Sequence, residues 1–189
     1  DYTHKDAHNS LDELRQLLWD GKQTEAHQLA NEKFMSQPLR QMSYQAFGNI
    51  LLNFSGHESI SNFRRQLDLS NAISTVSYKI DEVNFKREVF SSSPDQAIIN
   101  HIEASEPGQL NMEIGLNSLH SDYQVSVQNN EIILSGKVNN HADALSRKNV
   151  DFPDSKMTFE ARLKVVNEGG ELVKDKNGIK VVNADKVTL

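Results

Sequence analysis

Two pairs of neighbouring carboxylates are the first candidates for acid–base chemistry in this chain, Asp81 with Glu82 and Glu103 with Glu106. Two carboxyl groups can act as general acid and general base when they face a reacting bond from opposite sides. Both pairs lie in predicted turns, where carboxylates are normally solvated. Catalytic groups instead need burial or a charged neighbour. We therefore expect neither pair to be catalytic.

The histidines are the next candidates, because imidazole is a common metal ligand and proton carrier. They are scattered, and none forms the His-Glu-x-x-His pattern that places two imidazoles on one helical face. His101 lies between Ile99 and Glu103 on a predicted strand, where a hydrogen-bonded structural role is the simpler interpretation. The sequence also has no glycine-rich phosphate loop and no Gly-x-Ser-x-Gly turn. We expect no metal site and no cofactor.

Two aromatic residues could stack on a sugar ring, Trp19 and Tyr44. Trp19 follows a leucine stripe, which favours packing in the core or at a domain interface. Tyr44, Gln45 and Asn49 lie in a turn-rich segment before the first predicted strand, where loop residues often carry function. These three are our candidates for substrate contact, and a structural role is the alternative.

Composition excludes several classes of protein. The 189 residues carry a net charge of −6 with both signs interspersed, so we expect neither a nucleic acid nor an anionic membrane surface as partner. There are no cysteines, which excludes a disulfide framework. No apolar run is long enough to span a bilayer, and the first six residues lack the apolar core of a signal peptide.

The beginning of the chain predicts a helical hairpin within 10–35. Ser10 and Glu13 fit a capping box, and Gly21 is a natural stop for the first helix. Thr24 is placed to cap a second helix, which Pro38 interrupts. The apolar positions of the first helix share one face: Leu11, Leu14, Leu17 and Leu18.

After Pro38 the apolar pattern changes to a period of two, which is typical of strands. Asp81-Glu82, Glu106-Pro107-Gly108 and Asn129-Asn130 provide turn chemistry between the alternating segments. We expect a mainly β fold, an antiparallel sandwich whose strands follow one another as a meander. The first predicted strand follows the turn-rich segment and runs to Phe54, and further strands cover 72–80, 83–89, 96–104, 109–117, 122–128, 131–137 and 159–165.

Two further segments are distinctive. Residues 136–156 are polar and irregular, which predicts an excursion between strands. Residues 181–189 begin an alternating pattern that stops at Leu189, so we expect the sequence to be an internal piece of a larger protein. Unpaired strand edges recruit other strands. We therefore expect self-association near Val187-Thr188-Leu189.

Several motifs occur together and in a specific order. They are Leu-Trp-Asp-Gly-Lys at 18–22, Gln-Met-Ser-Tyr-Gln-Ala-Phe-Gly-Asn at 41–49, Arg-Arg-Gln-Leu-Asp-Leu at 64–69, Arg-Glu-Val-Phe at 87–90 and Ser-Pro-Asp-Gln at 93–96. In this combination the chain resembles the amino-terminal domain of glycoside hydrolase family 95, the α-L-fucosidases.

The resemblance implies a supersandwich-like β domain that precedes a helical linker and a catalytic (α/α)6 barrel. Residues 1–189 would be part of one such domain, with the helical hairpin and its connection in 1–43 and the strands in 44–189. In that family the barrel supplies a glutamate acid and the asparagine and aspartate residues that activate water. None of these has a counterpart here, so the resemblance implies a domain that is inactive alone.

The implied partners are the barrel of the same polypeptide and, through it, fucosylated oligosaccharides or polysaccharides. The implied location is secreted or periplasmic, with a cytoplasmic enzyme as the alternative. A different function class also remains open, a carbohydrate-binding or adhesion module without hydrolase activity. One tryptophan and four tyrosines offer few stacking platforms for that second class.

Overall fold

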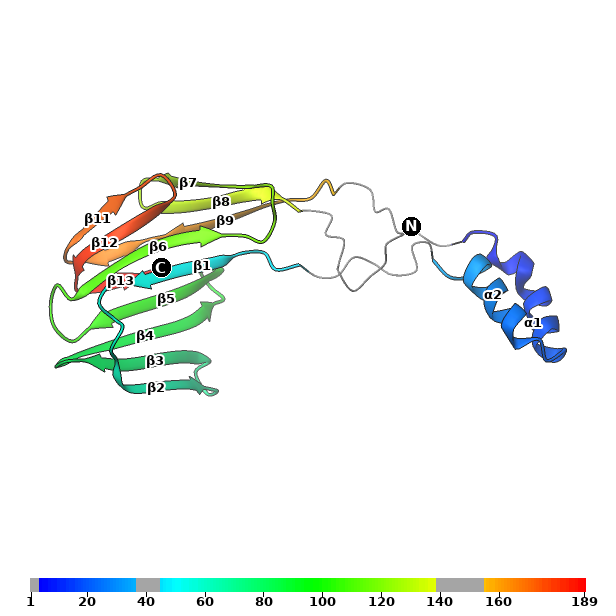
Figure 1. The fold of residues 1–189 in the computed structure, drawn as a ribbon, viewed down its shortest axis with the longest axis horizontal. Helices are drawn as coiled ribbons and strands as arrows, with labels where there is room; N and C mark the ends of the chain where they lie inside the picture. The colour runs from blue at the N-terminus through cyan, green and yellow to red at the C-terminus, as the bar shows by residue number, and fades with distance from the viewer. Residues whose placement is uncertain (1–3, 37–44, 139–154) are drawn as a thin grey trace. The chain divides into compact units, whose positions relative to one another are not determined.

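The computed structural model describes residues 4–36, 45–138 and 155–189. They fall into two compact units, a helical one and a β-rich one, drawn in Figure 1. The β-rich unit comprises Ala46–Asn140 and Pro153–Leu189. The predicted excursion at 136–156 lies mostly outside the described residues.

The helical unit contains the predicted hairpin. A 3-10 turn, η1 (Ala7–Ser10), leads into α1 (Leu11–Trp19), and α2 (Gln23–Lys33) follows. Gly21 ends the first helix at φ +72°, while the amide of Lys22 donates to the carbonyl of Leu17 across 2.9 Å. This is a glycine-dependent helix end, as predicted. None of the helices in the described part of the chain is long and apolar enough to cross a bilayer.

Three details of this unit differ from prediction. Ser10 precedes α1 but makes no side-chain capping bond, so the predicted capping box does not form. The second helix begins at Gln23, one residue before Thr24, with Lys22 in the capping position. Trp19, the last residue of α1, is 76% exposed in the described structure. Trp19 is therefore not packed in the core of the helical unit, and its packing at a domain interface stays a prediction.

The β-rich unit consists of three antiparallel sheets, counted over the described residues, and confirms a mainly β, sandwich-like fold. Sheet A has the order β1-β6-β12-β11, sheet B the order β10-β13-β5-β4-β3-β2, and sheet C the order β7-β8-β9. In sheet A the strands are β1 (Asn49–Phe54), β6 (Leu110–Asn117), β12 (Gly178–Ala184) and β11 (Glu171–Lys174). In sheet B they are β10 (Val166–Glu168), β13 (Lys186–Thr188), β5 (Ala97–Ala104), β4 (Val83–Ser92), β3 (Ile73–Ile80) and β2 (Ser61–Asp68). Sheet C contains β7 (Tyr123–Gln128), β8 (Glu131–Lys137) and β9 (Thr158–Lys164).

The predicted meander is only partly correct. Consecutive strands pair from β2 to β5 and from β7 to β9, but β6 pairs with β1 and β12 instead of β5 and β7. The hydrogen bonds of β6 therefore go to strands far away in the sequence. Such pairings arise from the packing of whole sheets and leave no local turn signal.

The core is continuous across the three sheets. Strand β6 shows the clearest alternation, with Leu110, Met112, Ile114 and Leu116 buried. The buried cluster extends to residues of β5, β8 and β12, including Ile102, Ile132, Leu134, Ile179 and Val181. Burial of each such side chain contributes about 1.5–3 kcal/mol. This core fixes the positions of the strands and therefore of the connections between them.

The carboxyl end lies inside sheet B. Strand β13 pairs with β10 on one side and β5 on the other, and Val187 is fully buried. Leu189 and Asn100 exchange two backbone hydrogen bonds, 2.9 and 3.0 Å long. The expectation of an open, sticky edge at Val187-Thr188-Leu189 is therefore wrong, because both sides of the strand are paired.

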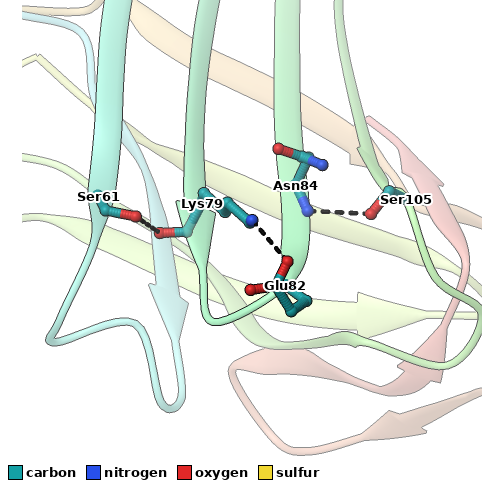
Figure 2. A network of polar contacts seen from close by, with 5 residues as sticks. All are labelled: Ser61, Lys79, Glu82, Asn84 and Ser105. Atoms are coloured by element: carbon teal, nitrogen blue, oxygen red, sulfur yellow. Dashed lines mark hydrogen bonds and ion pairs between the residues drawn. The ribbon is translucent and has the colours of Figure 1, made fainter.

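Polar contacts connect neighbouring strands at one end of sheet B, around the turn between β3 and β4, as Figure 2 shows. The predicted link Asp81-Glu82 joins β3 to β4, and Lys79 Nζ lies 2.8 Å from Glu82 Oε2. Ser61 Oγ donates to the carbonyl of Lys79. The amide of Asn84 donates to Ser105 Oγ across 2.9 Å. These contacts tie the turn between β3 and β4 to both neighbouring strands.

Candidate functional site

The residues predicted to contact substrate are not assembled into a site in the described structure. Asn49 begins β1, and its amide Nδ2 donates to Asn117 Oδ1 on β6 across 2.9 Å. This bond joins two paired strands and occupies the amide. Gln45 is half-buried outside any regular element, and Tyr44 lies outside the described residues. Substrate contact by these three stays a prediction.

Of the carboxylates that were weighed for catalysis, Glu103 is not in the predicted turn, because it lies half-buried within β5. Asp81 and Glu106 are exposed in turns, and the hydrogen bond from Lys79 lowers the pKa of Glu82. The backbone amide of Ser70 likewise lowers the pKa of Asp68. A general acid needs a raised pKa, so these two groups are shifted in the opposite direction. Among the described residues, no cluster of three His, Asp or Glu could hold a metal ion.

His101 has the structural role predicted for it. Its Nδ1 lies 2.9 Å from Thr188 Oγ1, which connects β5 to β13. Glu103 Oε2 lies 3.9 Å from the other ring nitrogen. The imidazole thus holds the carboxyl-terminal strand in the sheet.

An aromatic cluster that the sequence did not reveal lies between β1 and sheet B. It consists of Phe54, His57, Tyr78 and Phe85, which we call the His57 cluster. Tyr78 and Phe85 are stacked with ring centroids 5.4 Å apart, and His57 meets Phe85 edge-on at 4.5 Å. Phe54 approaches the imidazole from β1 at 5.0 Å. Aromatic pairs at these separations add about 0.5–1.5 kcal/mol each beyond the area that they bury.

The cluster contains one polar pair. His57 Nδ1 and the Tyr78 hydroxyl oxygen are 2.7 Å apart. Burial lowers the pKa of His57, with the charge of Glu58 opposing the shift. Burial also raises the pKa of Tyr78, against the effect of Arg87. Both shifts favour the uncharged forms of the two groups, which suits their apolar neighbours.

A hollow of about 250 Å³ opens beside the His57 cluster. Its other walls include Ile60, Phe63, Val76 and Arg87. Within this lining the Tyr78 hydroxyl contacts a base, His57, but burial raises the pKa of Tyr78 and so disfavours the phenolate that a nucleophile needs. A larger hollow of about 440 Å³ lies over sheet A, bordered by the exposed Leu51, Glu113 and Lys180.

Comparison with known proteins gives a consistent set of relatives. Residues 1–189 match the family described as glycosyl hydrolase family 65, N-terminal domain. Alpha-L-fucosidase 2 of Arabidopsis thaliana is 34% identical over 184 residues, which is 91% of this chain and 22% of that protein. Probable alpha-fucosidase A of Aspergillus niger is 24% identical over 133 residues, 70% of this chain and 15% of that protein. The chain thus spans less than a quarter of the length of either relative.

Proposed function

The chain belongs to the family of glycosyl hydrolase family 65 N-terminal domains, and we propose that it is the non-catalytic amino-terminal β domain of an inverting α-L-fucosidase. The family match and the two relatives named as fucosidases confirm the resemblance inferred from the motifs at 18–22, 41–49 and 64–69. The assignment to glycoside hydrolase family 95 is part of the proposal.

One observation carries the proposal. The chain aligns with the Arabidopsis fucosidase over 91% of its own length but over only 22% of the relative. A catalytic domain would occupy the larger remaining part of such an enzyme. The described residues support this division, because Asp81, Glu82 and Glu106 are exposed in turns and Glu103 lies within strand β5 beside His101.

The proposed role is mechanical support of an (α/α)6 barrel in the same polypeptide, with fucosylated oligosaccharides or polysaccharides as substrates of the whole enzyme. The continuous core from β5 through β6 and β12 to β8 gives the β-rich unit the rigidity that such support needs. Substrate contact by Tyr44, Gln45 or Asn49 remains a further proposal.

The supporting role is tested by removing 1–189 from a longer polypeptide that also contains the barrel. We expect the truncated enzyme to lose thermal stability and activity, because the barrel surface that the domain covers becomes exposed to water. The control is the intact polypeptide with Glu103→Gln, which should keep kcat within about two-fold. Unchanged melting temperature and activity after the deletion would contradict the supporting role.

We also propose that the whole enzyme acts outside the cytoplasm, in the periplasm or after secretion. The reason is that fucosylated polysaccharides are met outside the cell. The coding sequence upstream of Asp1 tests this: a charged, then apolar, then small-residue segment supports export. Without such a segment, the cytoplasmic alternative holds.

A further inference from the structure

One face of sheet B is apolar but exposed along its edge strand β2, beside β3. Phe63 and Leu67 alternate along β2 and are 59% and 61% exposed. Phe63 shares a hollow with Val76 of β3 and Phe85 of β4, so these side chains lie on one face. We call the surface of Phe63, Arg65, Leu67, Val76 and Arg87 the β2–β4 face. In Figure 1 no other strand is drawn over β2 and β3.

The opposite face of the same strands is polar. Arg64 and Gln66 of β2 border a hollow with Thr75 and Ser77 of β3 and Lys86 of β4. A strand that alternates in this way normally has its apolar side covered and its polar side in water. The alternation therefore indicates that the β2–β4 face is covered in the working protein.

The β2–β4 face also carries a specific charge pattern. Arg65 pairs in register with Val76, and Val76 with Arg87, so two guanidinium groups flank one valine. Neighbouring strands are about 4.8 Å apart, which places the two arginine backbones about 10 Å apart. Arg87 is half-buried, and within 4–36, 45–138 and 155–189 neither arginine forms an ion pair with a carboxylate. A partly buried guanidinium is costly unless an opposite charge meets it.

The charge pattern selects among the possible occupants. A second copy of the chain docked by a two-fold axis would bring the same patch against itself. That arrangement would place arginines near arginines, which is unfavourable. A sugar is a poorer match, because Phe63 is flanked on this face by the aliphatic Leu67 and Val76 and not by a second exposed aromatic ring. The complementary surface is a protein segment with carboxylates between apolar side chains.

We propose that the β2–β4 face docks a segment of the same polypeptide outside these 189 residues, and that carboxylates of that segment pair with Arg65 and Arg87. This inference rests on the proposed function, because it takes the chain as one part of a longer enzyme. It goes further by naming the docking surface and the chemistry of the segment that covers it.

Hydroxyl-radical labelling tests the proposal by comparing residues 1–189 alone with the longer, fucosidase-active polypeptide. We expect labelling of Phe63 and Leu67 to fall at least five-fold in the longer polypeptide. Arg65→Glu should restore labelling, because it places a carboxylate against the carboxylates of the partner segment. The matched control is Arg64→Glu, the adjacent residue on the polar face, which should leave labelling low.

The possible results separate this inference from the proposed function. An active enzyme with equal labelling of Phe63 and Leu67 in both proteins overturns the docking surface and leaves the function intact. Equal effects of the two arginine variants on labelling overturn the predicted role of the carboxylates. A longer polypeptide without fucosidase activity contradicts the proposed function, whatever the labelling. Circular dichroism of each variant of 1–189 verifies that it is folded. If a variant does not fold, the labelling of Phe63 and Leu67 in wild-type 1–189 and in the wild-type longer polypeptide still tests the docking surface.

Discussion

His57 and Tyr78 are joined by a contact of 2.7 Å between imidazole Nδ1 and the phenol oxygen. His57 lies in the connection between β1 and β2, whereas Tyr78 lies near the end of β3. The pair therefore fastens the crossing from sheet A to sheet B, beside the hollow that Phe63 and Arg87 line. Its removal should have measurable effects on the stability of the domain.

Tyr78→Phe should lower the free energy of unfolding by about 1 kcal/mol, because His57 loses its partner while remaining partly buried. Urea denaturation at pH 7.5 measures the change. The matched control is Tyr123→Phe on β7, a half-buried tyrosine outside the His57 cluster, which should change stability by less than about 0.5 kcal/mol. Equal destabilisation by both substitutions would show that the contact between His57 and Tyr78 does not contribute to stability.

The stability of the domain should fall in mildly acidic solution because of His57. Burial places the pKa of His57 in the folded protein below its unfolded value of about 6.5. The unfolded chain therefore takes up the proton first, so the contribution is fully present above pH 6.5 and decreases as pH falls toward the folded pKa. The difference between wild type and His57→Gln, measured by urea denaturation from pH 7.5 to 5.5, isolates this effect. Parallel curves for the two proteins would rule it out.

Gly170→Ala should destabilise the domain by about 1–3 kcal/mol. Gly170 has φ +58°, and a Cβ atom there would collide with the carbonyl oxygen of Val182. Gly115→Ala is the control, because a Cβ at that position in β6 meets nothing within 4 Å. Thermal unfolding compares the two variants, and similar melting temperatures would contradict the geometry of the β10–β11 turn.

Leu134→Ala should cost about 2–5 kcal/mol, since Leu134 belongs to the buried cluster that joins the three sheets. The same substitution at Leu119, which is 70% exposed, should cost less than about 0.5 kcal/mol. Chemical denaturation of both variants provides the comparison. A small loss at Leu134 would mean that sheet C packs loosely on the rest of the core.

The strands that the sequence predicts best have both regular alternation and a marked turn. The link Asp81-Glu82 forms the two-residue connection of β3 and β4, and Asn129-Asn130 forms that of β7 and β8. Asp81 and Asn129 adopt φ values of +48° and +52°, which Asp and Asn tolerate better than most residues. Local chemistry is sufficient in both hairpins.

Strand β2 was not predicted, because Arg64, Arg65 and Gln66 follow one another and hide the alternation. Arg65 lies on the apolar face of β2 and breaks the alternation of apolar and polar residues there. The same residue is part of the proposed docking surface. Strands β10 and β11 are also absent from the prediction, since runs of three and four residues are too short for a period to be visible.

The His57 cluster was beyond sequence analysis for a different reason. His57 lies in a connection without periodicity, and its contacts with Tyr78 and Phe85 exist only once β1 is placed beside sheet B. Asn49 was chosen because it lies in a turn-rich segment, yet its amide bonds Asn117 from a strand 68 residues away. A polar residue near a turn can have a structural or a functional role. Here the structural role of Asn49 becomes visible only once β1 is paired with β6.

The central claim, that this chain is the non-catalytic part of an α-L-fucosidase, is tested most directly by measuring fucose release from a fucosylated oligosaccharide by purified 1–189. The account predicts a rate equal to that of buffer, while a longer polypeptide containing the barrel releases fucose under the same conditions. Fucose release by 1–189 that a carboxylate-to-amide substitution within these residues abolishes would contradict it.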